Sequence, residues 1–500
     1  MLASLATLVG AGKAITADTM DPDAFWHLKV ADQLVSDGVG PLVDRLSFAS
    51  IKTPWTPYSW LGELLMRAIW NAGGFRLAVV VTAACSAAIV LLIAGAARCA
   101  TRREDGGSND VAVALLTFVA AWFSLPFISF RPVTFALVLM AAIVWLLVAD
   151  RRRATKWVWA VVPLTGVITN LHLYSGVVVV LAWLTAAGSW LPLPVFRGRV
   201  GEGLFSSGEQ ADDRRTPSLT LPRGTGRGDK MWLRYGLLAI GVTLAACGTP
   251  MLRGAVATAL SYNGSDPMVA SPFITEMRPF YSGASGKVSL VLFLMMTGAC
   301  VAGRRKLTAT DWLWLALGTA LLFRLGRFSP VFAILAMPTC AKAMPWLSGR
   351  VLGRRVVQVA LGIVLFAGAA NILPSLGQRD LDRWLNRNTP AYPTAAAAYV
   401  QANVPVRAGR LINEFNWGGY LAWRLGDRFQ VLLDGRTQLY TPDFWRQTHL
   451  GDAAARRSLL MTVDADAAVL PAKDSAFESV LLDLGWRPMY RDDLAVVLVR

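Results

Sequence analysis

Long apolar runs recur along the chain, from its first residues to about residue 374. Runs of about 15 to 22 apolar residues are typical of helices that cross a membrane, because about 20 helical residues span the bilayer core. The chain is 54% hydrophobic and 16% charged, which is too apolar for a soluble domain of 500 residues. The sequence therefore predicts a polytopic α-helical membrane protein with about eleven spans. The predicted spans are 1–17, 75–97, 111–124, 132–149, 157–170, 175–192, 232–249, 288–303, 310–324, 329–345 and 355–374.

Positive charge predicts how these spans are oriented. Lys and Arg gather in five of the connections, and all five can lie on one side of the membrane. Cytoplasmic loops carry an excess of Lys and Arg, so this side is expected to be the cytoplasm, and the membrane a cytoplasmic (inner) membrane. The N-terminus is then cytoplasmic, whereas a first outer loop at 18–74 and the segment 375–500 are extracytoplasmic. The five basic connections are 98–110, 150–156, 193–231, 303–309 and 346–355.

The distribution of charge argues against a nucleic-acid partner. The net charge is +16, but residues 375–500 contain 15 Lys and Arg against 14 Asp and Glu, so nearly all of the excess lies in the membrane half. Such an excess is a topology signal, and its natural counter-charge is anionic lipid. All five cysteines lie in or beside predicted spans, and no spacing of Cys or His typical of a metal site is present. We therefore expect no nucleic acid and no Cys or His metal site.

The sequence predicts a transmembrane domain at 1–374 and a soluble extracytoplasmic α/β domain at 375–500. Within the first, 193–231 is rich in Gly, Ser, Pro and Arg without periodicity, which predicts a disordered cytoplasmic insertion. In the second, helical and strand-like stretches alternate, which predicts a small sheet with helices packed on it. The expected helices are 393–403, 417–425, 442–460 and 475–484, and the expected strands are 409–415, 429–434, 466–470 and a pair within 486–499.

The first outer loop opens with residues 21–27, which read Asp-Pro-Asp-Ala-Phe-Trp-His. Pro22 disfavours helix at Asp21, so we expect a helix to begin near Asp23. Asp23 and His27 are then four residues apart on one helix face. Acids in a first helical turn also interact favourably with the helix dipole, which is a purely structural reason for them. The amphipathic helices expected in this loop are about 23–36 and 58–72.

Further polar residues stand at turns on the same predicted outer side: Arg131, His172, Glu276, and the pair Arg324 and Arg327. Charged groups at the membrane edge are candidates for function by default, and a lipid phosphate is a natural partner for arginine. Snorkelling of Arg131 to the interface and a surface ion pair at Glu276 are the structural alternatives.

Two clusters in the C-terminal segment stand where predicted strands end, a common place for binding groups. The first contains Trp417 and Tyr420, and the second contains Asp434 and Arg436. Both are candidates for binding an acceptor. The two glycines between Trp417 and Tyr420 could equally form only a tight turn from strand to helix.

This layout resembles the membrane glycosyltransferases of the C class, which have many spans, a long first outer loop with an acidic motif, and often an outer C-terminal domain. The opening Asp-Pro-Asp-Ala-Phe-Trp-His-Leu, followed by Pro54-Trp55 and Trp60-Leu61, looks like a bacterial branch of this superfamily. The C-terminal segment is similar to oligosaccharyltransferase catalytic subunits, with Thr389-Pro390 and then Asn-Trp-Gly-Gly-Tyr at 416–420. The second Trp and the Asp of that family's acceptor motif are missing, so recognition of a glycosylation sequon is not implied.

The resemblance implies transfer of a sugar from a polyprenyl-phosphate donor in the lipid bilayer to a glycan, lipid or protein acceptor at the extracytoplasmic face. Asp21 or Asp23 would be the base, with His27 beside them, and Glu276 a second acid. The leaving phosphate would be held by cations, with His27 and His172 as alternates. A divalent cation, Mg²⁺ or Mn²⁺, could bridge the outer-loop acids and Glu276, although no metal site is predicted. The candidate phosphate-binding residues are Arg131, His172, Arg324 and Arg327.

A non-catalytic membrane protein is the alternative function, either a transporter of lipid-linked sugars or a cell-envelope assembly or binding protein. A transporter is expected to show paired internal repeats and helices broken at mid-membrane. The sequence shows no repeat, and its polar residues gather at one face. A third possibility keeps the fold without the activity.

Overall fold

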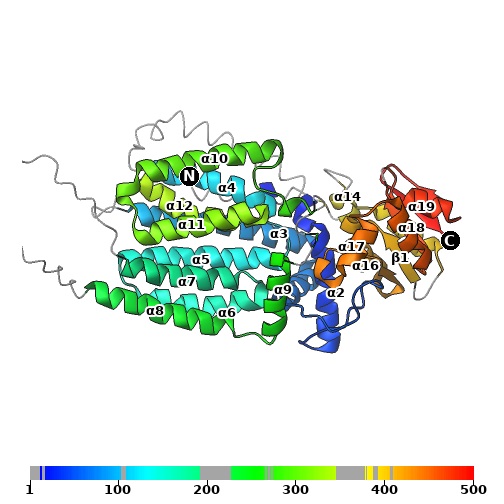
Figure 1. Ribbon diagram of the computed structural model, residues 1–500, viewed down its shortest axis with the longest axis horizontal. Coiled ribbons are helices and arrows are strands. Elements are labelled where there is room, and N and C mark those ends of the chain that lie inside the picture. Colours follow the sequence, from blue (N-terminus) through cyan, green and yellow to red (C-terminus); the bar gives the residue numbers. More distant parts are fainter. Residues whose placement is uncertain are drawn as a thin grey trace, which may run out of the picture.

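The computed structural model describes residues 12–13, 17–102, 108–191, 227–264, 267–268, 271, 274–344, 378, 380–386, 392–405, 409–473 and 475–500. A bundle of long helices forms one part of the molecule, and a smaller domain of helices and strands lies at one end of that bundle (Figure 1). The predicted spans 1–17 and 355–374, the insertion 193–231 and Thr389-Pro390 lie wholly or mainly outside the described residues.

Every predicted span in the described part of the chain has a helix. One more helix, α9, lies in the stretch 250–287, where the sequence predicts only a loop. The bundle helices are α3 (Trp60–Thr101), α4 (Asp110–Ser124), α5 (Pro132–Arg152), α6 (Val161–Leu171), α7 (Ser175–Trp190), α8 (Arg227–Ala246), α9 (Leu252–Gly264), α10 (Gly283–Ala302), α11 (Ala309–Arg324) and α12 (Ser329–Ala343).

Helix α3 joins two predicted elements, the outer-loop helix at 58–72 and the span at 75–97. The helical geometry is broken between them, at Gly73 and at Gly74, where φ is 60° and ψ is −154°. A positive φ of this kind is strained for any residue with a Cβ, so Gly74 permits the break. The two expectations are therefore correct in type, and a glycine pair marks the boundary between them.

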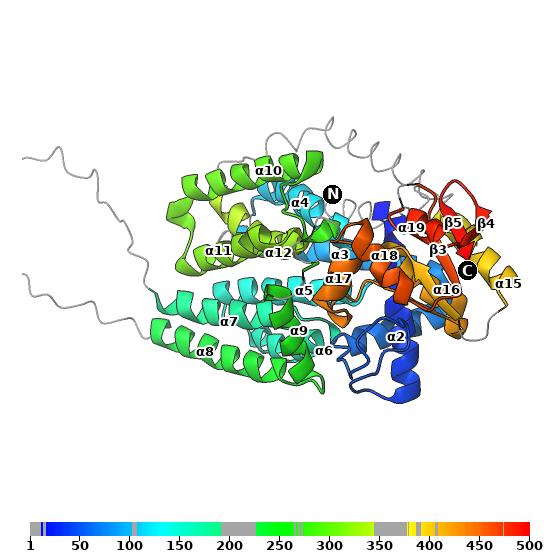
Figure 2. The same cartoon turned by 45° about the vertical axis from the view of Figure 1, so that its right-hand side comes forward.

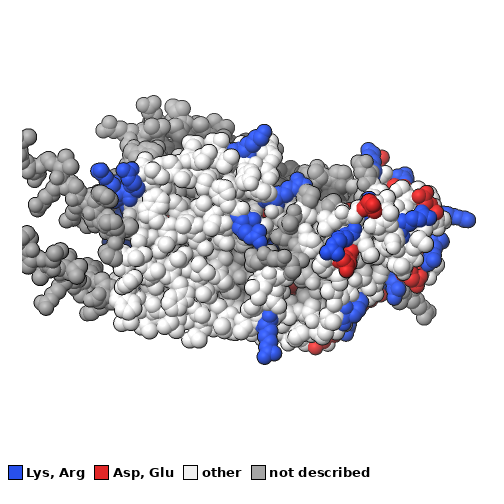
Figure 3. Space-filling view, in the orientation of Figure 1, with Lys and Arg blue, Asp and Glu red and all other residues white. Residues whose placement is uncertain are grey.

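Four helices of the described part are long and apolar enough to cross a membrane: α3, α5, α10, and α4 with the short turn that extends it to Phe127. Two shorter helices, Ser175–Trp190 and Met231–Ala246, are also apolar. The bundle surface in Figure 3 is broadly free of charge, and a group of cations lies at the end away from the smaller domain. The protein is therefore a membrane protein, and the count of about eleven spans stays a prediction.

The C-terminal domain is built on a five-stranded sheet with the order β2-β1-β3-β5-β4. Strand β1 pairs in parallel with β2 and β3, whereas β5 is antiparallel to β3 and β4. The sheet and its helices match the alternation predicted from sequence. The strands are β1 (Gly409–Asn413), β2 (Phe429–Val431), β3 (Ala467–Pro471), β4 (Arg487–Arg491) and β5 (Ala495–Val499), and the helices are α14 (Leu381–Leu385), α15 (Thr394–Asn403), α16 (Gly418–Leu425), α17 (Pro442–Thr448), α18 (Ala453–Thr462) and α19 (Glu478–Asp483).

The segment 18–74, which is predicted to be the first outer loop and keeps that name below, packs on this C-terminal domain through its first part. Its helix α2 (Pro22–Asp37) lies beside α16 in both ribbon views (Figures 1 and 2). Phe25 of α2 is fully buried, with its ring 5.4 Å from that of Tyr392 and 5.2 Å from that of Tyr420. Burial of a large aromatic side chain stabilises a contact by about 1.5–3 kcal/mol, so α2 is anchored against the C-terminal domain.

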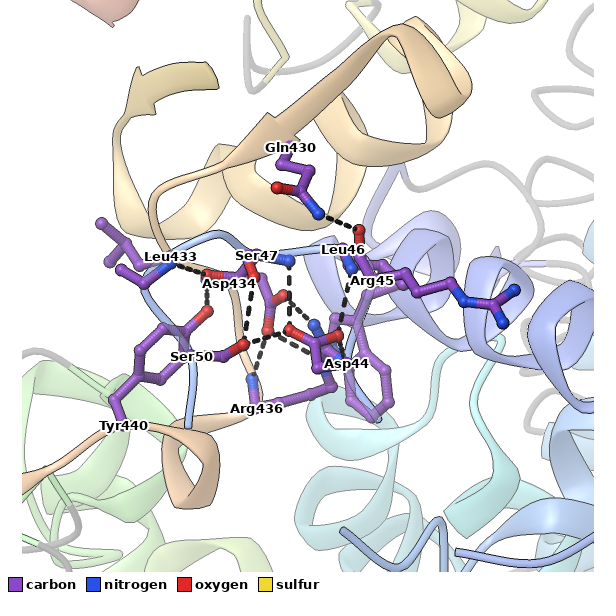
Figure 4. A network of polar contacts seen from close by, with 12 residues as sticks. Asp44, Arg45, Leu46, Ser47, Ser50, Gln430, Leu433, Asp434, Arg436 and Tyr440 are labelled. Carbon is purple, nitrogen blue, oxygen red and sulfur yellow. Dashed lines mark hydrogen bonds and ion pairs between the residues drawn. The ribbon is translucent and has the colours of Figure 1, made fainter. Parts of the chain in front are cut away.

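A buried polar network adds a second link between the loop and the domain (Figure 4). Arg436, in the turn after β2, donates from Nη1 to Asp44 Oδ1 of the outer loop at 2.7 Å and from Nε to Asp434 Oδ1 at 2.9 Å. Ser50 donates from its hydroxyl to Asp44 Oδ2 at 2.6 Å. The side chains of Arg436, Asp44 and Asp434 are 0% exposed. Removing one partner of such a network leaves a buried charge uncompensated, so the cluster holds loop and domain together.

Candidate functional site

Asp21 is the residue before helix α2, and its backbone is extended, with φ −70° and ψ 167°, as the following proline predicts. Its Oδ1 accepts hydrogen bonds from the backbone N–H groups of Asp23 at 3.0 Å and Ala24 at 3.2 Å. This is an N-cap, which satisfies N–H groups that the first helical turn leaves without partners. One oxygen of Asp21 therefore has a structural task, and the other is left for contacts outside the helix.

Arg131, just before α5, is the centre of an acidic cluster. Its Nε lies 2.9 Å from Asp21 Oδ2, its Nη1 2.9 Å from Asp23 Oδ2, and its Nη2 3.1 Å from Glu276 Oε2. The hydroxyl of Ser129 also donates to Asp21 Oδ2. Three carboxylates from two separate segments, the start of α2 and the turn at Glu276, thus share one guanidinium, whose five N–H donors suit such a fork.

Burial and the nearby arginines shift the pKa values of the three carboxyl groups. Burial raises the pKa of Asp21 to about 6, against the opposing effect of Arg131. Burial likewise raises the pKa of Asp23 above its usual value. Glu276 differs, because Arg131 and Arg327 together outweigh the effect of burial and lower its pKa to about 2. Glu276 is therefore ionised at neutral pH. Asp21, with a pKa of about 6, titrates near neutral pH, as groups with a proton-transfer role often do.

His27, on the same helix as Asp23, forms a pair with Glu63 of α3. Its Nδ1 lies 3.0 Å from Glu63 Oε1, and both side chains are buried. Burial and the nearby Arg131 lower the pKa of His27 well below its usual value, so the ring is neutral. Sequence reasoning missed Glu63. A lone acid in the apolar start of a membrane helix is the signal that could have identified it.

His172 and Arg327 lie on another side of the acidic cluster. Burial and the nearby Arg327 lower the pKa of His172 to about 3, so this ring is also neutral. Its buried Nδ1 has no hydrogen-bond partner among the described residues. Arg327 Nη2 lies 3.8 Å from Glu276 Oε1. A buried nitrogen without a protein partner is costly, and a bound ligand would satisfy it.

These groups line one cavity of about 820 Å³ between the bundle end and the C-terminal domain. Of the residues predicted from sequence, the cavity wall contains Asp21, Asp23, His27, Arg131, His172, Glu276, Arg327 and Trp417. Its wall also contains residues that were not among the candidate site residues: Tyr58, Ser129, Phe415, Asn416, Thr437 and Gln438.

Four predicted site residues do not line this cavity. Arg324, at the end of α11, is exposed. Tyr420 is fully buried in the core beside Phe25. Asp434 and Arg436 belong to the buried network that holds the first outer loop. Their surroundings give these residues packing or structural contacts rather than access to a ligand in the cavity.

Glycines let the C-terminal domain approach the acidic turn. A Cβ on Gly435 would lie 2.3 Å from Asp23 Oδ1, and a Cβ on Gly419 would lie 2.6 Å from the Pro22 carbonyl oxygen. Distances under about 3 Å are not tolerated, so only glycine permits these contacts. The glycines beside Trp417 and Arg436 therefore serve close packing of the domain on α2, and they bring the wall of the cavity up to Asp23.

The donor set does not fit a divalent cation as it stands. Among the described residues, no three His, Cys, Asp or Glu side chains are placed to hold a metal ion together. The three carboxylates that could supply hard oxygen ligands are each bonded to Arg131. No firm cofactor is supported, and no step below passes through a metal ion.

Comparison with solved structures shows that the chain has the fold of C-class glycosyltransferases, the class that its sequence resembles. No protein-family model and no curated protein sequence matches it. The oligosaccharyltransferase AglB from Archaeoglobus fulgidus, in complex with an inhibitory peptide and a dolichol-phosphate, is 10% identical with a TM-score of 0.52; the match covers 94% of this chain and 69% of that one. The same enzyme tethered to an acceptor peptide gives 13% identity and a TM-score of 0.51, covering 94% of this chain and 68% of that one.

A second kind of neighbour matches the whole chain. ArnT from Cupriavidus metallidurans, in its apo state, is 14% identical with a TM-score of 0.50, and the match covers 99% of this chain and 97% of that one. At these identities the likeness shows the fold, and the chemistry has to be argued from the site.

Proposed function

We propose that this protein is a glycosyltransferase that moves a sugar from a polyprenyl-phosphate donor to an acceptor. The observation that carries the proposal is the convergence of Asp21, Asp23, Glu276, Arg131 and Arg327 on one cavity at the end of an apolar helix bundle. Carboxylates that can accept a proton and a cation that can hold a phosphate are the groups this transfer needs. The archaeal neighbour that binds a dolichol-phosphate supports the class of donor.

Asp23 is the better candidate for the base. Each oxygen of Asp21 has two partners, two backbone N–H groups at Oδ1 and Ser129 and Arg131 at Oδ2. Each oxygen of Asp23 has one, the Trp26 indole at 2.9 Å and Arg131, and Asp23 is the more exposed of the two, at 28% against 19%. Its remaining lone pairs can accept a proton from an acceptor in the cavity. Asp21 then acts by positioning Asp23 and Arg131.

Arg327 and His172 are the candidates for holding the phosphate. Arg131, which the sequence offered for this role, directs its N–H groups at three carboxylates, so little of its charge remains for a ligand. Arg327 lines the cavity together with His172, and its Nη2 lies 3.8 Å from Glu276 Oε1. The buried Nδ1 of His172 has no protein partner among the described residues. A phosphate between the two side chains would be held by the guanidinium charge and would supply a partner for His172.

The proposed step balances as a substitution at the sugar. The acceptor oxygen or nitrogen forms a bond to the anomeric carbon while the bond from that carbon to the phosphate oxygen breaks. The electron pair of the broken bond leaves with the phosphate, towards Arg327, and the acceptor proton passes to Asp23. His27, fixed through Nδ1 by Glu63, presents its ring to the cavity as a neutral hydrogen-bonding group. The outer, extracytoplasmic location of this site is part of the proposal.

The test is a comparison of glycans and lipid-linked sugars in the native host by mass spectrometry. A deletion strain is complemented with the wild-type chain, with Asp23→Asn, or with Asp443→Asn, which alters an exposed acid on α17. The proposal predicts that one glycan disappears and its lipid-linked sugar accumulates with the deletion and with Asp23→Asn, at normal protein abundance. An unchanged profile with Asp23→Asn would remove the acid from the chemistry, and an unchanged profile with the deletion would remove the transfer itself.

A further inference from the structure

A second cavity, of about 270 Å³, lies at the opposite end of the helix bundle from the first. Its wall is formed by the C-terminal ends of α3, α5, α7 and α12 and the N-terminal starts of α8 and α11. Helix α5 begins at the acidic cluster and ends here, and α7 likewise begins beside His172 and ends here. We call this cavity the basal recess. It is lined by Ala100, Val148, Arg151, Arg152, Gly188, Ser189, Met231, Tyr235, Thr308, Thr310, Asp311, Trp314, Pro338, Thr339 and Lys342.

Three cations and one carboxylate stand in the wall of the basal recess. Arg151 Nη2 lies 2.9 Å from Asp311 Oδ1, and Lys342 Nζ lies 2.6 Å from Asp311 Oδ2. Asp311 also accepts from the backbone N–H and the hydroxyl of Thr308, both at 2.8 Å, in the capping box of α11. Within the described part of the chain, Arg152 donates to the Cys99 carbonyl, at 2.7 Å, and is not bonded to a carboxylate. Asp311 is thus saturated, and it balances one of the three positive charges.

The remaining wall residues of the recess supply donors rather than further acids. Hydroxyls come from Ser189, Thr310 and Thr339, and Arg151 is held with its guanidinium 5.2 Å from the centre of the Trp314 ring. The Arg151 side chain is 17% exposed and that of Lys342 28%, so these charges are partly removed from water. Among the described residues of the wall, cations therefore exceed anions by two. A recess of this kind favours a ligand with negatively charged oxygens.

The position of the recess indicates where such a ligand comes from. Trp157 and Trp190, at this same end of the bundle, are 75% and 69% exposed. Exposed tryptophans at helix ends are typical of the level of lipid headgroups. Basic pockets between membrane helices at that level bind anionic headgroups. We propose that the basal recess binds the phosphate group of an anionic phospholipid, with Arg151, Arg152 and Lys342 as its cationic contacts.

The experiment measures lipid retention by the full chain. The protein is reconstituted in nanodiscs of equal parts phosphatidylglycerol and phosphatidylcholine, released into detergent, and weighed by native mass spectrometry. We expect wild-type protein to retain phosphatidylglycerol over phosphatidylcholine. Arg152→Gln should lower that retention about tenfold, because it removes a cation without leaving a carboxylate unpaired. Arg153→Gln removes the same charge from the adjacent exposed residue outside the recess and should change nothing.

A second variant should raise the retention of phosphatidylglycerol instead of lowering it. Asp311→Asn removes the only carboxylate of the described wall and should raise retention of phosphatidylglycerol, even though it weakens the cap of α11. Equal retention by Arg152→Gln and Arg153→Gln would overturn the proposal. Inorganic phosphate that stabilises the detergent-purified protein against heat through Arg152, with no lipid preference, would assign the recess to a soluble phosphate and also overturn the lipid claim. None of these readouts requires sugar transfer, so a failure here is distinct from a failure of the proposed function.

Discussion

Two clusters in this protein combine arginine with carboxylates. They differ in their exposure to solvent and in the number of carboxylates that the arginine contacts. Arg131 serves three carboxylates at the wall of a large cavity, and its side chain is 12% exposed. Arg436 serves two carboxylates with side chains that are 0% exposed. In the closed cluster, Ser50 and backbone N–H groups satisfy Asp44 as well. In the open one, burial raises the pKa of Asp21 to about 6.

The comparison shows why similar residue types lead to different roles. A cluster that is sealed from solvent, with its carboxylates held by an arginine, a hydroxyl and backbone N–H groups, can only hold segments together. A cluster that is open to a cavity, with carboxylates whose pKa is raised by burial, keeps groups that can accept a proton. The sequence cannot make this distinction, since both clusters join residues far apart in the chain.

The largest effect is expected where the closed cluster loses its cation. Arg436→Met leaves Asp44 and Asp434 buried without a counter-charge, which should cost about 3–5 kcal/mol of unfolding free energy. The measurement is thermal or denaturant unfolding of the purified protein. Arg446→Met, whose ion pair with Asp443 is on the surface, is the control and should cost less than about 1 kcal/mol. Equal costs would mean that the network does not join loop and domain.

Loss of an acid from the open cluster should lower activity strongly and leave stability unchanged or higher. Asp23→Asn is expected to lower the rate of sugar transfer by about 10²–10⁴-fold, the usual contribution of a general base. Its stability should stay the same or rise, because the pKa of this buried carboxyl is raised and its charged form is disfavoured. Transfer assays and unfolding on the same preparation measure both. An Asp23→Asn variant that is active, or that is inactive only because it unfolds, would contradict the role of Asp23 as the base.

A smaller effect is expected from the phosphate contact. Arg327→Gln should lower kcat/KM for the lipid-linked donor about 10- to 100-fold, because a charge-assisted contact to the leaving phosphate is lost. Arg324→Gln is a matched control: the same residue type three positions away, exposed and not part of the cavity wall. Donor titrations of both variants decide the matter. Equal losses would indicate a general effect of charge at this turn.

The contributions of the two clusters to folding stability should change in opposite directions as the pH falls. The pKa of Asp21 in the folded protein, about 6, lies above its unfolded value, so its ionisation costs stability. Its contribution to folding stability therefore rises as pH falls from about 6 towards 4. Transfer should decrease at acid pH, because burial raises the pKa of Asp23, the proposed base, and a protonated Asp23 cannot accept the acceptor proton. For Asp44, burial is opposed by Arg436 together with hydrogen bonds from Ser50 and the Leu46 backbone N–H, and their combined effect lowers the pKa. The stability that ionised Asp44 contributes is fully present above the pKa that Asp44 has in the unfolded chain. It is lost only as the pH falls through the lower pKa of Asp44 in the folded protein. Activity and unfolding measured from pH 4 to 8 test both signs.

Much of the fold could be predicted from sequence because its signals are local. Apolar run length predicted the helices, and alternation predicted the strands of the C-terminal domain. Pro22 predicted the extended backbone at Asp21 and the start of α2. Helix α9 was missed, because a stretch of mixed polarity between spans carries no strong periodic signal.

The site could be predicted only in part. Acids, histidines and arginines at turns on one predicted side were identified, and most of them line the cavity. Their pairing could not be foreseen, because Arg131 meets Asp21 and Asp23 across about a hundred residues and Glu276 across more than a hundred. Gly435 looked like part of an acceptor motif beside Asp434, whereas its contact with Asp23 shows a packing reason for it. Tertiary contacts, not local pattern, decide such roles.

The central claim is that the cavity between bundle and domain holds the lipid phosphate of the donor. The most direct measurement is an experimental structure of the full chain in nanodiscs with an added polyprenyl phosphate. We expect the phosphate inside the cavity, within hydrogen-bonding distance of Arg327 and His172. Its polyprenyl chain should extend out of the cavity between the helices. A phosphate bound elsewhere, with the cavity left to solvent, would contradict it.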